Sequence, residues 1–238
     1  MHTIDLAYVG RGLHEELAAY IADQENYYAD EGVHVALRDG CDWGEERLRR
    51  GATIGLGRAL LSRLTSGIPW VALTVNTHRP LFWFLARPGL TDLSDLAGHR
   101  LAVHPPHAAP GCFARIVLRW KVLAWVGDHF QIPTVGLAVD PTYIHPDDPA
   151  VAAVVRAHRR ALKVIHNNPD TTVRYIQTFL GRHTADEARA HYNTFIAPHF
   201  TPDGQADLAV GAAAIAAVTT ELGVPATLTA PEFYRTAH

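Results

Sequence analysis

The sequence predicts an α/β fold, because short apolar strands alternate with helical segments through the first half of the chain. The first forty residues show the repeating unit. The run IDLAYVG is broken by Gly10 and Gly12, apolar residues then recur at helical spacing, and VHVALRDG alternates up to an Asp-Gly turn. The second half is mostly helical. A parallel or mixed sheet flanked by helices accommodates both halves.

The remaining elements follow from local signals along the chain. A first helix is expected to carry Leu13, Leu17, Tyr20, Ile21 and Tyr28 and to end at Gly32. Further β-rich runs are IPWVALTVN, LFWFLARP and HRLAVHPP, with a short helix at TDLSDLAG. APGCFARIVLRW starts a helix with proline and glycine in its first turn.

In the second half, helix starts are expected at Asp148-Pro149, at Pro169 and at Thr184, where Glu187 completes a capping box. An alanine-rich helix is expected over about 204 to 222, ending at Gly223.

Composition limits the possible functions. The chain has 238 residues, of which 48% are hydrophobic and 19% charged, as in ordinary globular proteins. Its formal charge of -3 disfavours a nucleic-acid partner. No apolar run reaches the roughly 20 residues of a membrane span, so membrane insertion is not expected. Two cysteines form no disulfide framework. No secretory leader precedes the first strand, so we expect a cytoplasmic protein, or a periplasmic or extracellular one whose leader has been removed.

Four segments in order resemble the NMT1/THI5-like and alkanesulfonate/taurine-binding solute-binding proteins of ABC importers. They are IDLAYVG…YYADEGVHVAL, GATIGLGRALLSRLTSGIPWVALTV, LTDLSDLAGHRLAVHPP and YIHPDDPAVAAVVRAHRRALKVIHNNPDTTVRYIQTFLG. The resemblance implies a two-lobed, type II periplasmic-binding-protein fold that binds a small molecule between its lobes. It would place the first lobe at 1–98 and 141–238 and a reduced second lobe at 99–140. The second lobe is short because the chain after GCFARIVLRW runs almost at once into segments resembling those that return to the first lobe.

In open sheets of this kind, ligands bind outside the carboxyl ends of the strands. This rule, together with the resemblance, selects the turns that follow the expected strands and the start of the helix near residue 110. The candidate ligand-binding residues are Tyr8, Arg11, Gly55, Gly57, Arg58, Asn76, Thr77, His78, His104, His107, Gly111, Cys112, Asp128 and His129.

The stretch HPPHAAPGC allows several interpretations. His104, His107 and Cys112 could bind zinc, but no second ligand pair stands nearby. Cys112 could be a thiolate nucleophile at a helix start, or a small buried hydrophobic residue. We favour a fourth interpretation, in which backbone amides at 109–113 hold a polar ligand group. Fifteen histidines are scattered along the chain, and four are expected on helix surfaces: His158, His166, His183 and His191. We therefore expect no metal site and no cofactor.

Two classes of function follow. The first is the solute-binding component of an ABC importer, with a small organic anion or a thiamine-pyrimidine-like heteroaromatic as ligand and a permease as partner. The alternative is an enzyme on the same scaffold, either a desulfinase- or decarboxylase-like lyase or a relative of the pyrimidine-precursor synthases. The synthases use a lysine as substrate, and the two lysines here, Lys121 and Lys163, both lie outside the strand-end turns. No complete catalytic constellation is evident, so binding is the preferred function.

Overall fold

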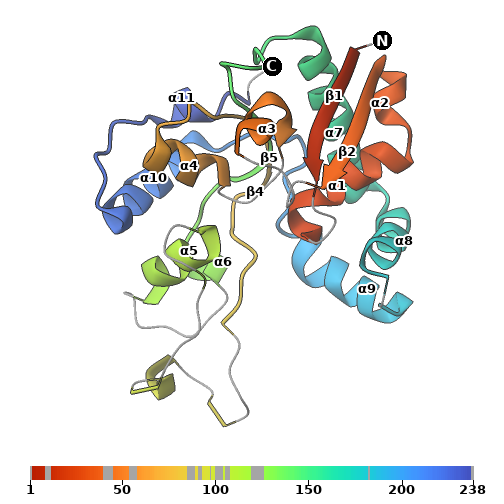
Figure 1. Ribbon diagram of the computed structural model, residues 1–238. Coiled ribbons are helices and arrows are strands. Elements are labelled where there is room, and N and C mark those ends of the chain that lie inside the picture. Colours follow the sequence, from red (N-terminus) through yellow and green to blue (C-terminus); the bar gives the residue numbers. More distant parts are fainter. Residues whose placement is uncertain are drawn as a thin grey trace.

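The computed structural model describes residues 2–8, 12–39, 45–53, 58–84, 89–90, 93–96, 98–99, 104, 108–118, 126–181 and 183–236. At its centre lies a five-stranded sheet with the strand order β2-β1-β3-β5-β4 (Figure 1). Its strands are β1 (His2–Tyr8), β2 (Val33–Asp39), β3 (Ala52–Thr53), β4 (Val71–Thr77) and β5 (Thr134–Val139).

The direction of the strands determines where a ligand can approach. β1 pairs in parallel with β2 and β3, whereas β5 is antiparallel to both β3 and β4. The first four strands therefore point the same way, and their carboxyl ends meet at one edge of the sheet. We call this edge the carboxyl edge. The expected α/β class with a mixed sheet is confirmed.

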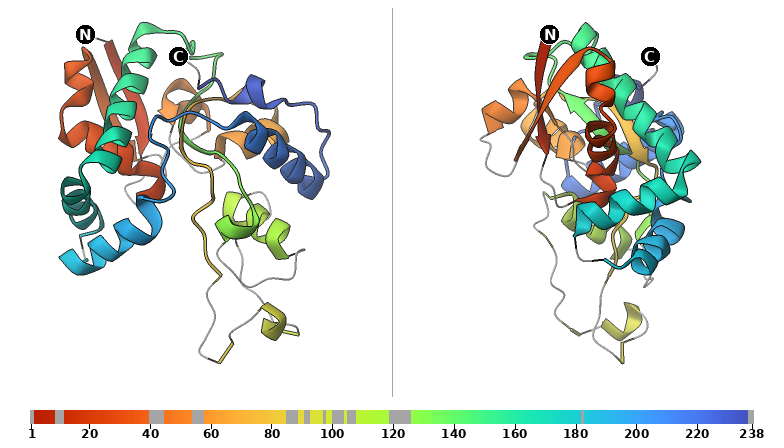
Figure 2. Two further views of the ribbon diagram at one scale, coloured as in Figure 1. Left: turned by 180° about the vertical axis from the view of Figure 1, so that it is seen from behind. Right: turned by 90° about the vertical axis from the view of Figure 1, so that its right-hand side faces the viewer.

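Helices form two groups, each around one of two apolar clusters (Figures 1 and 2). One group packs with β1 and β2 around a large apolar cluster and consists of α1 (Leu13–Gln24), α2 (Tyr27–Asp30), α7 (Pro149–Asn167), α8 (Pro169–Leu180), α9 (Ala185–His191) and η3 (Tyr192–Ile196). The other group packs around a second cluster and consists of α4 (Arg58–Ser66), α5 (Ala109–Leu118), α6 (Val126–His129), α10 (Leu208–Leu222) and α11 (Ala230–Phe233). In this second group, α5 and α6 lie beyond the carboxyl end of β4 (Figures 1 and 2). Two short elements complete the description, α3 (Glu45–Arg50) and η2 (Leu93–Leu96).

Several helix boundaries agree with the local signals. The Asp148 side chain caps α7 by accepting the backbone N–H of Ala150 at 2.8 Å. Thr184 and Glu187 form the expected capping box of α9. α10 ends at Gly223, whose φ of +66° is the left-handed conformation that glycine adopts without strain.

Two expectations about local structure are corrected. The first helix does not run on to Gly32, because Asn26 adopts φ +58° and separates α1 from α2. Residues 81–84 of LFWFLARP form no strand. They belong to an extended segment that leaves β4 and contacts the returning chain, with Ile132 donating to the His78 carbonyl at 2.9 Å and Val126 to that of Phe82 at 3.1 Å. The aromatic residues favour extended chain, but two isolated hydrogen bonds do not make a ladder.

The division of the chain into lobes stays a prediction, since much of 99–140 lies outside the described residues. Within that range, β5 pairs with β3 and β4 in the central sheet, and α5 packs on α10 in the second apolar cluster. The reduced size of the second lobe likewise stays a prediction. None of the helices in the described ranges is long and apolar enough to cross a membrane.

Candidate functional site

The structure does not describe the side chains of five predicted ligand-binding residues. Arg11, Gly55, Gly57 and His107 lie outside the described residues, and Tyr8 ends β1 with a side chain that is likewise not described. The other nine can be located, and the structure distributes them among different roles.

Asn76 lies in the interior, beneath the carboxyl edge. All seven residues of β4 are buried, so a polar side chain near the end of this strand points into protein on either face. The Asn76 amide nitrogen donates to the carbonyls of Glu15 at 2.8 Å and His14 at 3.3 Å, in the first turn of α1. Its oxygen lies 2.8 Å from Nε2 of His158, which is also buried. Asn76 therefore holds the start of α1 against the sheet.

Thr77 and His78 also make contacts within the protein. The hydroxyl oxygens of Thr77 and Thr134 lie 2.5 Å apart, and this buried pair joins the ends of β4 and β5. Half-buried His78 accepts the backbone N–H of Asp207 at its Nε2, at 2.9 Å, next to the start of α10. Burial lowers the pKa of His78, although Asp207 and Asp203 act in the opposite direction.

The charged candidate residues lie at the surface, on α4 and on the segment that leads into β5. Asp128 on α6 forms an ion pair with Arg79 at 3.2 Å. This pair joins the segment that leaves β4 to the segment that leads into β5. His129 follows Asp128 and is exposed. Arg58 is the exposed first residue of α4, the helix that follows β3 along the chain.

The stretch around Cys112 belongs mainly to the core. Cys112 is 0% exposed and packs in the second apolar cluster beside Phe113, while Gly111 is buried in the first turn of α5. Burial raises the pKa of the Cys112 thiol to about 11, and Glu221 adds to this effect. A reactive thiolate is therefore not supported, and the interpretation as a small buried hydrophobic residue describes the side chain best. His104 is exposed.

Four aromatic rings that the sequence did not single out meet near the carboxyl edge. We call them the histidine–aromatic cluster: His14, Trp83, His191 and Phe195. Each ring contacts two others in a closed circuit, with centroid distances of 5.9 Å for His14–Trp83, 4.8 Å for Trp83–Phe195, 5.2 Å for Phe195–His191 and 5.1 Å for His191–His14. Trp83 is 39% exposed, so the cluster is open to solvent on the side of this ring.

Three different parts of the chain contribute to this cluster. His14 stands in the first turn of α1, shortly after the carboxyl end of β1, and Trp83 lies in the segment that leaves β4. His191 ends α9, and Phe195 lies in η3, a π-helical turn in which Ala197 donates to the Tyr192 carbonyl at 2.9 Å. Such π-turns occur frequently at functional sites.

The imidazoles of this cluster are held neutral. Burial lowers the pKa of His14 to about 3, and the neighbouring His191 and His199 act in the same direction. Burial also lowers the pKa of His191, with a further contribution from His183. The expectation that His158 and His191 lie on helix surfaces is wrong, since His158 is fully buried and His191 half-buried. Of the four histidines expected there, only His183 is exposed, since His166 is also half-buried and contacts the Phe200 carbonyl.

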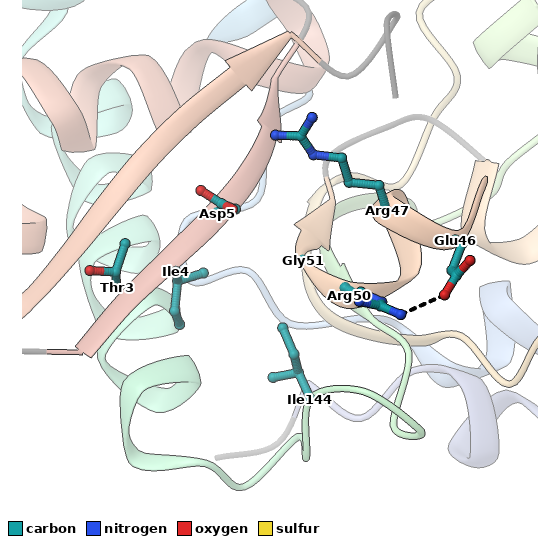
Figure 3. A pocket seen from close by; sticks show the side chains of 8 residues that line it. All are labelled: Thr3, Ile4, Asp5, Glu46, Arg47, Arg50, Gly51 and Ile144. Atoms are coloured by element: carbon teal, nitrogen blue, oxygen red, sulfur yellow. Dashed lines mark hydrogen bonds and ion pairs between the residues drawn. The ribbon is translucent and has the colours of Figure 1, made fainter. Parts of the chain in front are cut away.

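Two pockets formed by described residues are compared with the carboxyl edge. The larger, of about 710 Å³, lies between β1 and α3 (Figure 3). Three of its charged side chains are already paired, Arg50 with Glu46 at 2.5 Å and Asp5 with Arg38 at 3.1 Å, and the pocket flanks the amino-terminal half of β1. The smaller, of about 390 Å³, lies beside the end of β4 and is lined by His78, Arg79 and residues 198–203 and 205–207. Of these two pockets, the smaller adjoins the carboxyl edge.

Within the described ranges, no group of three or more histidine, cysteine, aspartate or glutamate side chains is arranged to hold a metal ion.

Comparison with known proteins gives a match at the level of structure alone. No protein-family model matches the chain, and no curated protein matches it. A Candida albicans protein, described as having the generic periplasmic binding protein structural fold, matches with a TM-score of 0.67 and 15% identity, over 94% of this chain and 90% of that one. The chain has the periplasmic-binding-protein fold.

Two further structures with 12–14% identity agree with this fold. A Bordetella bronchiseptica protein matches with a TM-score of 0.67 and 14% identity, over 99% of this chain and 95% of that one. The alkanesulfonate-binding protein SsuA from Xanthomonas axonopodis pv. citri, solved with bound MOPS, matches with a TM-score of 0.63 and 12% identity, over 98% of both chains. The expected periplasmic-binding-protein fold is thus confirmed, and identities this low define the fold alone.

Proposed function

We propose that this chain is a small-molecule binding protein that holds its ligand at the carboxyl edge, against the histidine–aromatic cluster. The observation that carries the proposal is the convergence of the four rings on the edge where open α/β sheets bind ligands. An apolar and aromatic surface with a few polar groups is what small-molecule sites offer.

The chemistry of the cluster favours a planar heteroaromatic ligand over an organic anion. Trp83 offers a large, partly exposed ring face, and the neutral imidazoles of His14 and His191 can donate or accept one hydrogen bond each without adding charge. An anion would need an available cation, but Arg79 is paired with Asp128, which leaves Arg58 at the start of α4 as the described candidate. A role in import, with an ABC permease as partner, rests on the sequence resemblance to solute-binding proteins.

A thermal-shift screen followed by calorimetry tests this function. The panel contains pyrimidines and other heteroaromatics, alkanesulfonates and carboxylates of similar size. We expect at least one heteroaromatic to raise the Tm, and Trp83→Ala to abolish that increase while His34→Ala, on the exposed face of β2, leaves it unchanged. Stabilisation by sulfonates alone, lost in Arg58→Ala and retained in Trp83→Ala, would overturn the choice of ligand class. A panel without any stabilising solute would overturn the function.

A further inference from the structure

Two histidines from distant parts of the chain face each other in the histidine–aromatic cluster. Nε2 of His14 and Nε2 of His191 are 3.0 Å apart, although 177 positions separate the residues in the sequence. The ring planes differ by 10° and the ring centres are 5.1 Å apart, so the two nitrogens are the points at which the rings meet.

The contact between the two Nε2 atoms depends on which ring nitrogens carry a proton. A neutral imidazole carries one N–H and one lone pair, so two facing Nε2 atoms form a hydrogen bond only when one is protonated and the other is not. Moving the proton of one ring from Nε2 to Nδ1 leaves both rings neutral and turns two lone pairs toward the same point. Neutral imidazole is the form of histidine that binds metals.

The distance between the nitrogens agrees with binding of a single ion. Imidazole nitrogens lie about 2.0–2.1 Å from a bound zinc ion, so two of them at angles of about 90–110° are roughly 2.8–3.4 Å apart. We propose that His14 and His191 bind one divalent transition-metal ion, of the group Zn²⁺, Ni²⁺ and Cu²⁺, through their Nε2 atoms. Imidazole is a preferred ligand of these ions, whereas Mg²⁺ and Ca²⁺ prefer oxygen ligands.

The proposed metal site has two protein ligands and several neighbouring side chains. In the part of the chain that the structure describes, no third metal-binding side chain joins the two histidines. Trp83 contacts the ring of His14, and Phe195 contacts the ring of His191. The Asn76 amide nitrogen donates to the backbone carbonyls of His14 and Glu15 and so holds the first turn of α1. The site requires no bound solute, so this inference stands independently of the proposed function.

Isothermal titration with Zn²⁺ on the full chain, freed of metal and of any affinity tag, tests the proposal in the absence of solute. We expect one tight site per chain, and a loss of at least about tenfold in affinity in His14→Gln and in His191→Ala. His34→Ala is the matched control for binding to exposed histidines and should leave the affinity unchanged. Circular dichroism of each variant confirms that it is folded. An affinity that is the same in wild type, His14→Gln and His191→Ala, or no binding to the wild type, would overturn the proposal.

Electron paramagnetic resonance with one equivalent of Cu²⁺ gives a second readout. We expect hyperfine coupling to two imidazole nitrogens in the wild type and to fewer in either variant. Coupling to the same number of imidazole nitrogens in the wild type and in both variants would contradict the assignment.

Discussion

Two regions of the molecule contain a neutral, buried or partly buried histidine, the core behind β4 and the carboxyl edge. In the core, burial lowers the pKa of His158 to about 4, and its Nε2 lies 2.8 Å from the Asn76 oxygen. At the edge, burial lowers the pKa of His14 to about 3, and its Nε2 faces another histidine beside the partly exposed Trp83. The perturbation is similar in both regions. What distinguishes a candidate site from a structural contact is therefore the partner and the access to solvent, and not the size of the pKa shift.

Asn76 joins the two regions. Its oxygen contacts His158, and its nitrogen donates to the carbonyls of His14 and Glu15. The core network thus sets the position of the first turn of α1 and, with it, the position of His14. Substitutions in the core should consequently affect the edge, whereas substitutions at the edge should leave the core intact.

The largest effect is expected for Gly136→Ala, in β5. A Cβ atom at this position would lie 2.2 Å from the Asn76 oxygen and 2.8 Å from Nε2 of His158. Both side chains are buried, so the network must shift, and we expect the free energy of unfolding to fall by at least about 3 kcal/mol. Chemical denaturation measures it. A change below about 1 kcal/mol would show that the core network is not tightly packed.

Acid is expected to destabilise the protein through His158. The folded-state pKa of about 4 lies below the usual value of about 6.5, so the unfolded chain binds the proton first as the pH falls. The free energy of unfolding should therefore decrease between pH 6.5 and pH 4, by up to about 3 kcal/mol from this residue, and His14 adds a change in the same direction. Denaturation curves across this range should show a smaller slope for His158→Gln. An unchanged slope would exclude His158 as a source of the acid sensitivity.

Asn76→Ala is expected to reduce the free energy of unfolding by about 2 kcal/mol, because it leaves buried His158 without this partner. It should also weaken Zn²⁺ binding, although Asn76 is no metal ligand. Thr74→Val is the matched control on the same strand. The Thr74 hydroxyl has no hydrogen-bond partner among the described residues, so its removal should change stability by less than about 1 kcal/mol. Equal changes in the free energy of unfolding and in Zn²⁺ affinity for the two substitutions would show that Asn76 does not link the core to the carboxyl edge.

A smaller effect is expected for Thr184→Ala at the start of α9, the helix that ends with His191. The Thr184 hydroxyl accepts the backbone N–H of Glu187 at 3.2 Å in the capping box. Losing this cap should cost about 1 kcal/mol, with little change at the core histidine. Denaturation together with the NMR signals of the histidine rings checks both points. A shifted His158 signal would show that α9 and the core are more strongly coupled than the contacts indicate.

Local signals in the sequence predicted much of the fold. Asp148 before proline, the Thr184–Glu187 pair and Gly223 each set a helix end through contacts within a few residues, and such contacts are visible in a sequence. The break at Asn26 was not predicted, because a left-handed asparagine gives a weaker signal than glycine.

The candidate site was harder to predict. The rule that ligands bind at strand ends led to Asn76 and Thr77, but β4 is buried on both faces, so these side chains point into the protein. The contact between His14 and His191 was not predicted, because 177 positions separate the two residues and no local sequence pattern indicates it. Trp83 lies in a run that the sequence predicted to be β-rich, but residues 81–84 of that run form no strand and the Trp83 ring is partly exposed.

Calorimetric titration of the wild type and Trp83→Ala with the best stabilising solute tests the central claim most directly. Stacking of an aromatic ligand on this ring should contribute about 1 kcal/mol or more, so we expect at least about a fivefold loss of affinity in Trp83→Ala and none in His34→Ala. If a solute binds the wild type and Trp83→Ala with the same affinity, the ligand does not lie against the histidine–aromatic cluster, and the account of this site is wrong.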